Sequence, residues 1–193
     1  MSYIPITASG LTVSKKTFYQ RTVLYDNTLS GSGSWDVTSI DQTYDHLELL
    51  IWGRSTRSAG TDELLIAFNN DTTDANYNLS QLYTTSSSVT GGTANARNTA
   101  LVVAATQSSN RFSPYRFILQ NYTDSSKYKS IIGMGRDDAD TTSSAFHITR
   151  SLTWKNTAAI DRIGLAAEVG SIAAGSRLQI IGMKAEAVVI DVT

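Results

Sequence analysis

The sequence contains no cysteine, which excludes both a disulfide framework and a thiolate metal site. Charged residues make up only 17% of the chain, and 16 basic against 17 acidic side chains leave a formal net charge of -1. Such a balance provides no excess of cations to neutralise phosphates, so the composition argues against nucleic acid as the main partner. Without disulfides, stability has to come from packing or from oligomerisation, and we expect oligomerisation.

Long apolar runs are also missing, since no segment approaches the roughly 18 consecutive apolar residues that suggest a membrane span. The first residues, Met1 to Ile6, have neither the basic nor the apolar region of a signal peptide. We therefore expect a protein that is made in the cytoplasm without a recognisable export signal. A chain of 193 residues is long enough for one sandwich with a substantial core, with or without arms.

The sequence is rich in period-two alternation of apolar and polar residues. Alternating segments are separated by clusters of Gly, Ser, Thr, Asn and Asp, a pattern typical of all-β domains. It predicts eleven strands, at 18–25, 34–38, 46–54, 63–69, 76–84, 99–104, 113–121, 128–135, 144–154, 162–167 and 177–184. In the third of these, Leu47, Leu49 and Ile51 fall on one face, as expected for a strand that covers a core. Because a minimal jelly roll has eight strands, some of the eleven must be arms, split strands or wrong predictions.

Two segments and both chain ends have a different composition. Residues 55–62 and 86–98, the latter with Gly91 and Gly92, are predicted to be exposed loop tips. Residues 187–193 are apolar and β-branched, and a strand there needs a partner edge in its own sheet or in a neighbouring subunit. We therefore predict an N-terminal arm over 1–21, a sandwich over 22–183 and a C-terminal strand or arm over 184–193. The residues assigned to assembly through these arms are Tyr3, Ile4, Ile6, Val188, Val189 and Ile190.

Candidates for catalysis and metal binding are few. No motif pairs a serine with His46 or His147, so we expect both histidines to hydrogen-bond across strands or to face solvent. The acidic loops at 69–76 and 136–140 hold oxygen ligands of the kind that calcium prefers, but neither has EF-hand spacing. Asn and Asp form similar clusters in Asx-turns, which we predict here, with calcium as the alternative. We expect no enzyme activity, no metal and no cofactor.

Carbohydrate binding is a further function of β-sandwiches, and it needs exposed aromatic side chains beside polar groups. The candidate glycan contacts are Tyr77, Tyr83 and Tyr122, with Tyr128 as an additional tyrosine. The competing interpretation places most of these rings in the core or on a sheet surface.

Several short segments combine turns and strand starts in a fixed order along the chain. They are 43–49 (TYDHLEL) with 54–55, 66–71 (IAFNND) with 75–77, 127–130 (KYKS), 154–160 (WKNTAAI) and 174–177 (AGSR). In order and spacing these segments resemble the jelly-roll structural domains of tailed bacteriophages and prophages, over about residues 22–183. The resemblance implies an antiparallel β-sandwich on a virion, as a capsid decoration protein, head fibre or tail-associated adhesin, commonly a homotrimer. It implies neither an enzyme nor a cofactor.

The position on the virion can be narrowed further. Long tail fibres usually join such a domain to a collagen-like, coiled-coil or β-helical shaft, whereas here about twenty residues precede the domain, enough for a docking arm. We therefore expect a capsid decoration (cement) protein that stabilises the head shell. The alternative is a short tail or baseplate adhesin that binds a host-surface glycan. The expected partners are copies of the same chain and the major capsid protein or other virion proteins, with no membrane and no nucleic acid.

Overall fold

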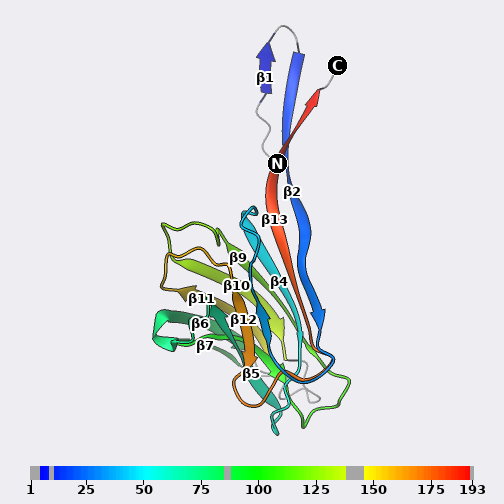
Figure 1. Cartoon of the computed structure of the whole chain (residues 1–193), viewed down its shortest axis with the longest axis vertical. Helices are drawn as coiled ribbons and strands as arrows, with labels where there is room; N and C mark the ends of the chain where they lie inside the picture. The colour runs from blue at the N-terminus through cyan, green and yellow to red at the C-terminus, as the bar shows by residue number, and fades with distance from the viewer. Residues whose placement is uncertain (1–4, 9–10, 85–87, 138–145, 192–193) are drawn as a thin grey trace.

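The computed structural model describes residues 5–8, 11–84, 88–137 and 146–191, which form an all-β protein (Figure 1). The strands are β1 (Pro5–Ala8), β2 (Leu11–Thr28), β3 (Trp35–Val37), β4 (His46–Gly53), β5 (Thr61–Phe68), β6 (Tyr77–Thr84), β7 (Val89–Ala94), β8 (Asn98–Val103), β9 (Ser113–Gln120), β10 (Lys129–Arg136), β11 (His147–Trp154), β12 (Ile163–Ala167) and β13 (Arg177–Asp191). A single 3-10 turn, η1 (Asp74–Asn76), precedes β6. Within these ranges no helix has the length and apolar character needed to cross a membrane.

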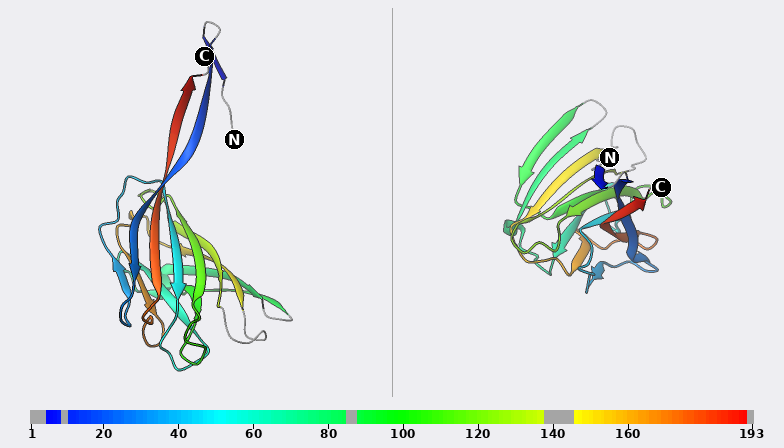
Figure 2. Two further views of the ribbon diagram at one scale, coloured as in Figure 1. Left: turned by 90° about the vertical axis from the view of Figure 1, so that its right-hand side faces the viewer. Right: turned by 90° about the horizontal axis from the view of Figure 1, so that it is seen from above.

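The strands form two antiparallel sheets that pack as a sandwich, as predicted. One sheet has nine strands in the order β1-β2-β13-β4-β9-β10-β11-β6-β7, and the other has four in the order β3-β12-β5-β8. Within these orders, β2-β13-β4-β9 opposite β3-β12-β5-β8 is the strand arrangement of an eight-stranded jelly roll. The remaining strands β10, β11, β6 and β7 extend the larger sheet beyond β9, and Figure 2 shows them curving away from the rest of the body.

Each of the eleven predicted strands is present, and two further strands were not predicted. One is β1, and the other is β7, which lies inside the segment 86–98 that was predicted to be a loop tip. The loop prediction is wrong for Val89–Ala94 because β7 pairs along its whole length with β6 while all six of its residues stay exposed. A strand that buries no side chain needs no apolar alternation, so its composition resembles that of a loop.

The core lies between the two sheets, and the alternation in the sequence identifies the strand faces that build it. The core includes Trp35, Leu47, Leu49, Ile51, Leu64, Ile66, Phe68, Tyr115, Phe117, Leu119, Ile163 and Leu165. The rings of Tyr115 and Phe117 stack with centroids 5.8 Å apart and lie opposite two glycines of β10, Gly135 and Gly133 respectively. These glycines leave room for the rings to lie against the sheet.

Side chains of β9 cover the outer edge of the smaller sheet, at β8. The Tyr115 hydroxyl accepts a hydrogen bond from the Leu101 amide (3.2 Å) and donates one to the Leu101 carbonyl (2.7 Å). Burial raises the pKa of Tyr115, so the hydroxyl keeps the proton that it donates. The Ser113 hydroxyl accepts a further bond from the Val103 amide (2.9 Å). These bonds use backbone groups on the outer edge of β8, which pairs with β5 alone among the described strands.

The two ends of the chain form a two-stranded ribbon that rises from the body (Figures 1 and 2). β2 and β13 pair from Thr28 and Arg177 out to Val13 and Asp191, whereas β4 accompanies β13 only as far as Met183. At that point Asp45 ends the pairing, because its amide donates to the Met183 carbonyl (2.9 Å) and its carboxylate accepts from the Ala185 amide (2.7 Å). The predicted boundaries at 21/22 and 183/184 thus fall inside β2 and β13, so the arms continue strands of the sandwich.

Candidate functional site

The residues assigned to assembly lie in the ribbon or outside the described part of the chain. Tyr3 and Ile4 fall outside it, while Ile6 belongs to β1 and pairs with Val13. Val188, Val189 and Ile190 belong to β13 and pair with Lys16, Lys15 and Ser14 of β2. The partner edge that the C-terminal strand needs is therefore provided by its own chain. Beyond Met183, the other edge of β13 pairs with none of the described strands.

Two of the three predicted glycan contacts are core residues, and the prediction is wrong for them. Tyr77 is fully buried, and its hydroxyl accepts from the Phe68 amide (3.0 Å) and donates to the Asp71 carbonyl (2.9 Å). Tyr122 is also fully buried and donates to the Asp41 carbonyl. Burial raises the pKa of each tyrosine to about 12. Neither ring can contact a glycan, because both rings are enclosed and both hydroxyls bind backbone groups.

The two histidines lie on two inner strands of the nine-stranded sheet, at opposite ends along the strand direction. His46 begins β4 opposite Gln120 at the end of β9, whereas His147 begins β11 opposite Arg136 at the end of β10. The His46 Nδ1 atom accepts from the Asn121 amide (3.2 Å), and His147 is exposed. The prediction that each histidine forms a cross-strand hydrogen bond or faces solvent is confirmed: His46 forms the hydrogen bond, and His147 faces solvent. Within the described ranges, no three side chains of the types that bind metals come together.

The first acidic loop is held by hydrogen bonds to Asp71. One carboxylate oxygen accepts from the Thr73 amide (3.0 Å), and the other accepts from the Asn76 side chain (2.9 Å) and the Trp154 indole (2.8 Å). The bond to Thr73 confirms the predicted Asx-turn. The second loop falls largely outside the described residues, although Asp137 at its start accepts a bond from the Phe146 amide (2.8 Å).

Asp71 makes the stability of this loop depend on pH. Burial raises the pKa of Asp71, but the hydrogen bonds from Trp154, Thr73 and Asn76 outweigh burial and lower it below its usual value. A carboxyl with a lowered pKa stabilises the fold above the pKa of the unfolded chain, and that contribution disappears as the pH falls toward the folded value. We expect Asp71→Asn to reduce the free energy of unfolding by about 1–2 kcal/mol at pH 7. The difference from wild type should shrink below about pH 4.

Urea unfolding of both proteins between pH 7 and pH 2.5 measures this effect. The exposed Asp161 provides the control, since Asp161→Asn should follow the wild-type curve. A difference between Asp71→Asn and wild type that stays constant down to pH 2.5 would contradict the assignment.

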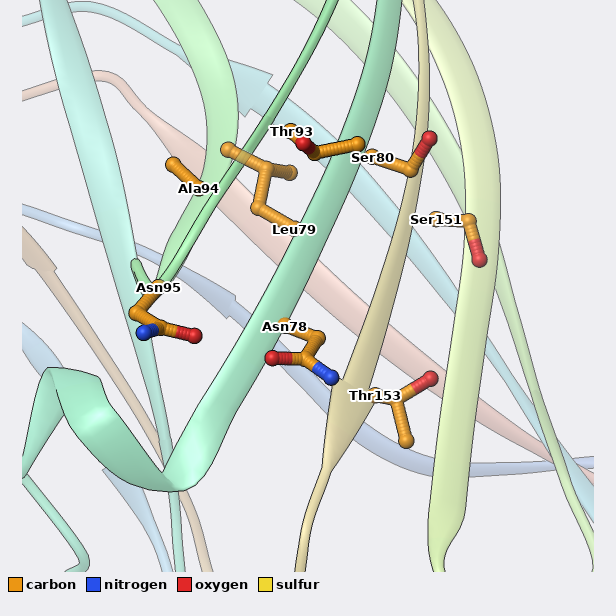
Figure 3. Close-up of a pocket in the computed structure, with 8 residues that line it drawn as sticks. All are labelled: Asn78, Leu79, Ser80, Thr93, Ala94, Asn95, Ser151 and Thr153. Carbon is orange, nitrogen blue, oxygen red and sulfur yellow. The ribbon is translucent and has the colours of Figure 1, made fainter.

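A groove of about 480 Å³ lies on the outer face of β6, β7 and β11, and the side chains that line it are drawn in Figure 3. It is lined by Asn78, Leu79, Ser80, Thr93, Ala94, Asn95, Ser151 and Thr153. These side chains can exchange hydrogen bonds with a ligand, but they include neither an aromatic ring nor a charge. Among the described residues, Leu79 and Ala94 supply its apolar surface, which is less than the aromatic and aliphatic lining that normally provides most of the affinity for a small ligand.

A second cavity, of about 460 Å³, lies on the inner side of the same extension of the sheet. It is lined by Glu63, Gln81, Tyr83, Leu101, Phe146, Ile148 and Arg150. The guanidinium of Arg150 donates from Nη1 and Nη2 to the two carboxylate oxygens of Glu63 (2.5 and 2.8 Å) and from Nε to the Gln81 side-chain oxygen (3.0 Å). The rings of Tyr83 and Phe146 meet edge to face, with centroids 6.0 Å apart. Tyr83 is therefore the predicted glycan contact that lines a cavity.

The charged residues of this cavity were not predicted from the sequence. Glu63 and Arg150 are 87 positions apart, and no local motif joins them. One signal was available, because Arg150 occupies an inward position of β11 between the buried Ile148 and Leu152. An arginine at such a position needs a buried partner.

Comparisons of the chain with protein-family models, with curated proteins and with solved structures find no match. The resemblance to virion domains therefore stays a prediction. The function of the protein is inferred below from the geometry of the ribbon and of the sheet surfaces.

Proposed function

We propose that this chain is a structural protein of a tailed-bacteriophage virion, a capsid decoration protein that attaches to the head shell through its ribbon. The observation that supports the proposal is the ribbon itself. β2 and β13 continue past the body with only each other, and with β1 near the tip, as described neighbours. An isolated two-stranded ribbon is marginally stable in water, so a projecting ribbon is best explained as an element that another protein surface completes.

The direction of the ribbon fits attachment to a shell. The ribbon of β2 and β13 projects from one end of the body (Figure 2), and β4 starts at that end, since His46 pairs with Met183. The loop that follows β4 therefore lies at the far end of the sandwich. Attached through the ribbon, the protein presents that far end to the surroundings of the particle.

The outer face of the larger sheet supports contacts with neighbouring copies or capsid subunits. Ile132 and Met134 of β10 are exposed by more than half, and Leu82 of β6 by nearly half. Ile132 pairs with the half-buried Ile118 of β9, and Thr149 lies between Met134 and Leu82, so the residues form one patch. Exposed apolar patches of this kind mark sites of protein association. In this proposal the protein is a homotrimer without catalytic activity, and the patch contacts other virion proteins.

Electron microscopy of virions that carry the protein tests the proposal. Gold-labelled antibodies against the chain should mark the head surface at many positions. Labels confined to the tail end would favour the adhesin alternative instead. Particles that carry no label, in a preparation in which the free protein is recognised by the same antibody, would contradict a virion role altogether.

A further inference from the structure

The cavity lined by Glu63, Tyr83 and Arg150 lies where the added strands leave the jelly roll. β6 and β11 face it from the larger sheet, while β5 and β8 face it from the smaller one. Its volume of about 460 Å³ falls in the range of roughly 300–1,000 Å³ that is usual for small-molecule sites. The cavity thus has the size for a ligand, and it lies between two strands of the jelly roll, β5 and β8, and two added strands, β6 and β11.

The polar side of the cavity combines donors and acceptors without a net charge. Arg150 is 5% exposed, and its charge is balanced by the two hydrogen bonds to Glu63. The three bonds to Glu63 and Gln81 use three of the five N–H donors of a guanidinium. Each Glu63 oxygen also has a second lone pair. Hydroxyl groups, which both donate and accept, match this arrangement better than an anion does, because Arg150 is already paired with a carboxylate.

The remaining described residues that line the cavity have apolar surface. Tyr83 and Phe146 supply aromatic surface, and Leu101 and Ile148 supply aliphatic surface beside them. A ligand that matches both the polar and the apolar lining needs an apolar face and an edge of neutral hydroxyls. A sugar ring has this distribution, since its C–H groups form one face while its hydroxyls project from the rim.

We propose that this cavity binds a neutral saccharide, with Tyr83 and Phe146 against the sugar ring and with Arg150, Glu63 and Gln81 hydrogen-bonded to its hydroxyls. The site is independent of the decoration role, because its residues lie in the body and not in the ribbon. The saccharide is bound without being cleaved. Glycosidases use two carboxyl groups, and Glu63 provides the single carboxylate among the described residues that line the cavity.

Saturation-transfer NMR on the full chain tests the site with maltotriose, cellotriose, mannotriose and chitotriose as neutral probes and sialyllactose as an acidic one. At least one neutral probe should show saturable binding at concentrations up to about 10 mM. Tyr83→Ala should weaken that binding about tenfold, as expected when one aromatic contact is truncated. Tyr83→Phe keeps the ring and should bind within about threefold of wild type. Tyr128→Ala, at an exposed tyrosine outside the cavity, is the matched control and should change nothing.

Leu101→Trp gives a second variant that does not depend on Tyr83. The larger side chain fills the cavity from β8 and should abolish binding while the melting temperature stays close to that of wild type. The proposal is overturned if no neutral probe binds, or if sialyllactose alone binds. It is also overturned if binding survives in both Tyr83→Ala and Leu101→Trp, since the probe would then occupy another surface. The position of the protein on a virion is tested separately, by the labelling of particles described above.

Discussion

Gly133→Ala should be among the most destabilising single substitutions in this chain, with a loss of about 3 kcal/mol or more in the free energy of unfolding. The added Cβ would lie 2.2 Å from the Arg116 carbonyl oxygen and 2.3 Å from the ring of Phe117. Both contacts are shorter than any stable van der Waals separation. The Arg116 oxygen belongs to the backbone of β9, so relief requires the two central strands to separate or the aromatic stack to break.

The control for this substitution is another glycine in a strand. At Gly92 of β7 no atom lies within 4 Å of an added Cβ, so Gly92→Ala should stay within about 0.5 kcal/mol of wild type. Denaturant unfolding of both variants and of wild type measures the difference. If Gly133→Ala proves as stable as Gly92→Ala, the close contact between β10 and the Phe117 ring is wrong.

Most of the strands could be predicted from the sequence because apolar residues that face the core alternate with residues that face outward. In β4 and β5, every second residue is buried between the sheets, and the pattern that places Leu49 and Ile66 in the core is visible in either strand alone. The same argument fails for β7, whose stability depends on backbone bonds to β6 and not on buried side chains. A strand of that kind has no alternation of apolar and polar residues, so hydrophobic periodicity does not predict it.

The candidate site was less predictable than the fold, because it depends on pairs of residues far apart in the chain. Tyr77 and Tyr122 are tyrosines next to polar residues, as glycan contacts often are. Only the hydrogen bonds between their hydroxyls and backbone groups show that both side chains are internal. Tyr83 lies on the same strand as Tyr77, β6, but its ring lines the cavity, whereas the ring of Tyr77 packs beside Phe68 in the core. The place of Tyr83 is set by the pairing of β6 with β11, which joins segments about seventy residues apart, and nothing in either segment specifies the other.

The ribbon was predicted only in part. The apolar C-terminal strand required a partner edge, but the sequence left open whether β13 finds that edge within the chain or in another subunit. The structure pairs it with β2, which leaves the remaining edge of the ribbon for other molecules. The proposed contact with other molecules is therefore the whole two-stranded ribbon and not the three side chains of residues 188–190.

Removal of the ribbon should abolish attachment to the virion while the sandwich keeps its fold. A chain of residues 20–185 lacks the part of β2 and β13 that extends beyond β4. The buried residues of the described core lie between Trp35 and Ile181, so the truncation removes none of them. We expect the free energy of unfolding to change by about 1 kcal/mol or less, because every residue described as buried is kept.

Binding should respond very differently to the same truncation. If the ribbon supplies the main contact with the shell, its loss should reduce the affinity for undecorated particles by at least about a hundredfold, which corresponds to roughly 2.8 kcal/mol. A trimer would amplify this loss, since linked copies raise the effective concentration of each contact. Cosedimentation of the purified chain with undecorated particles measures the affinity, and sedimentation equilibrium measures whether the full chain is larger than the 20.9 kDa monomer.

A substitution at the opposite end of the sandwich separates attachment from general damage. Ser58 is exposed in the loop that follows β4, so Ser58→Trp adds bulk far from the ribbon and should leave attachment unchanged. Full decoration by the truncated chain would refute the ribbon as the point of attachment. A full chain that sediments as a clean monomer would refute the trimer but not the attachment. If Ser58→Trp alone blocks binding, the far end of the sandwich contacts the particle, and the orientation proposed for the protein is reversed.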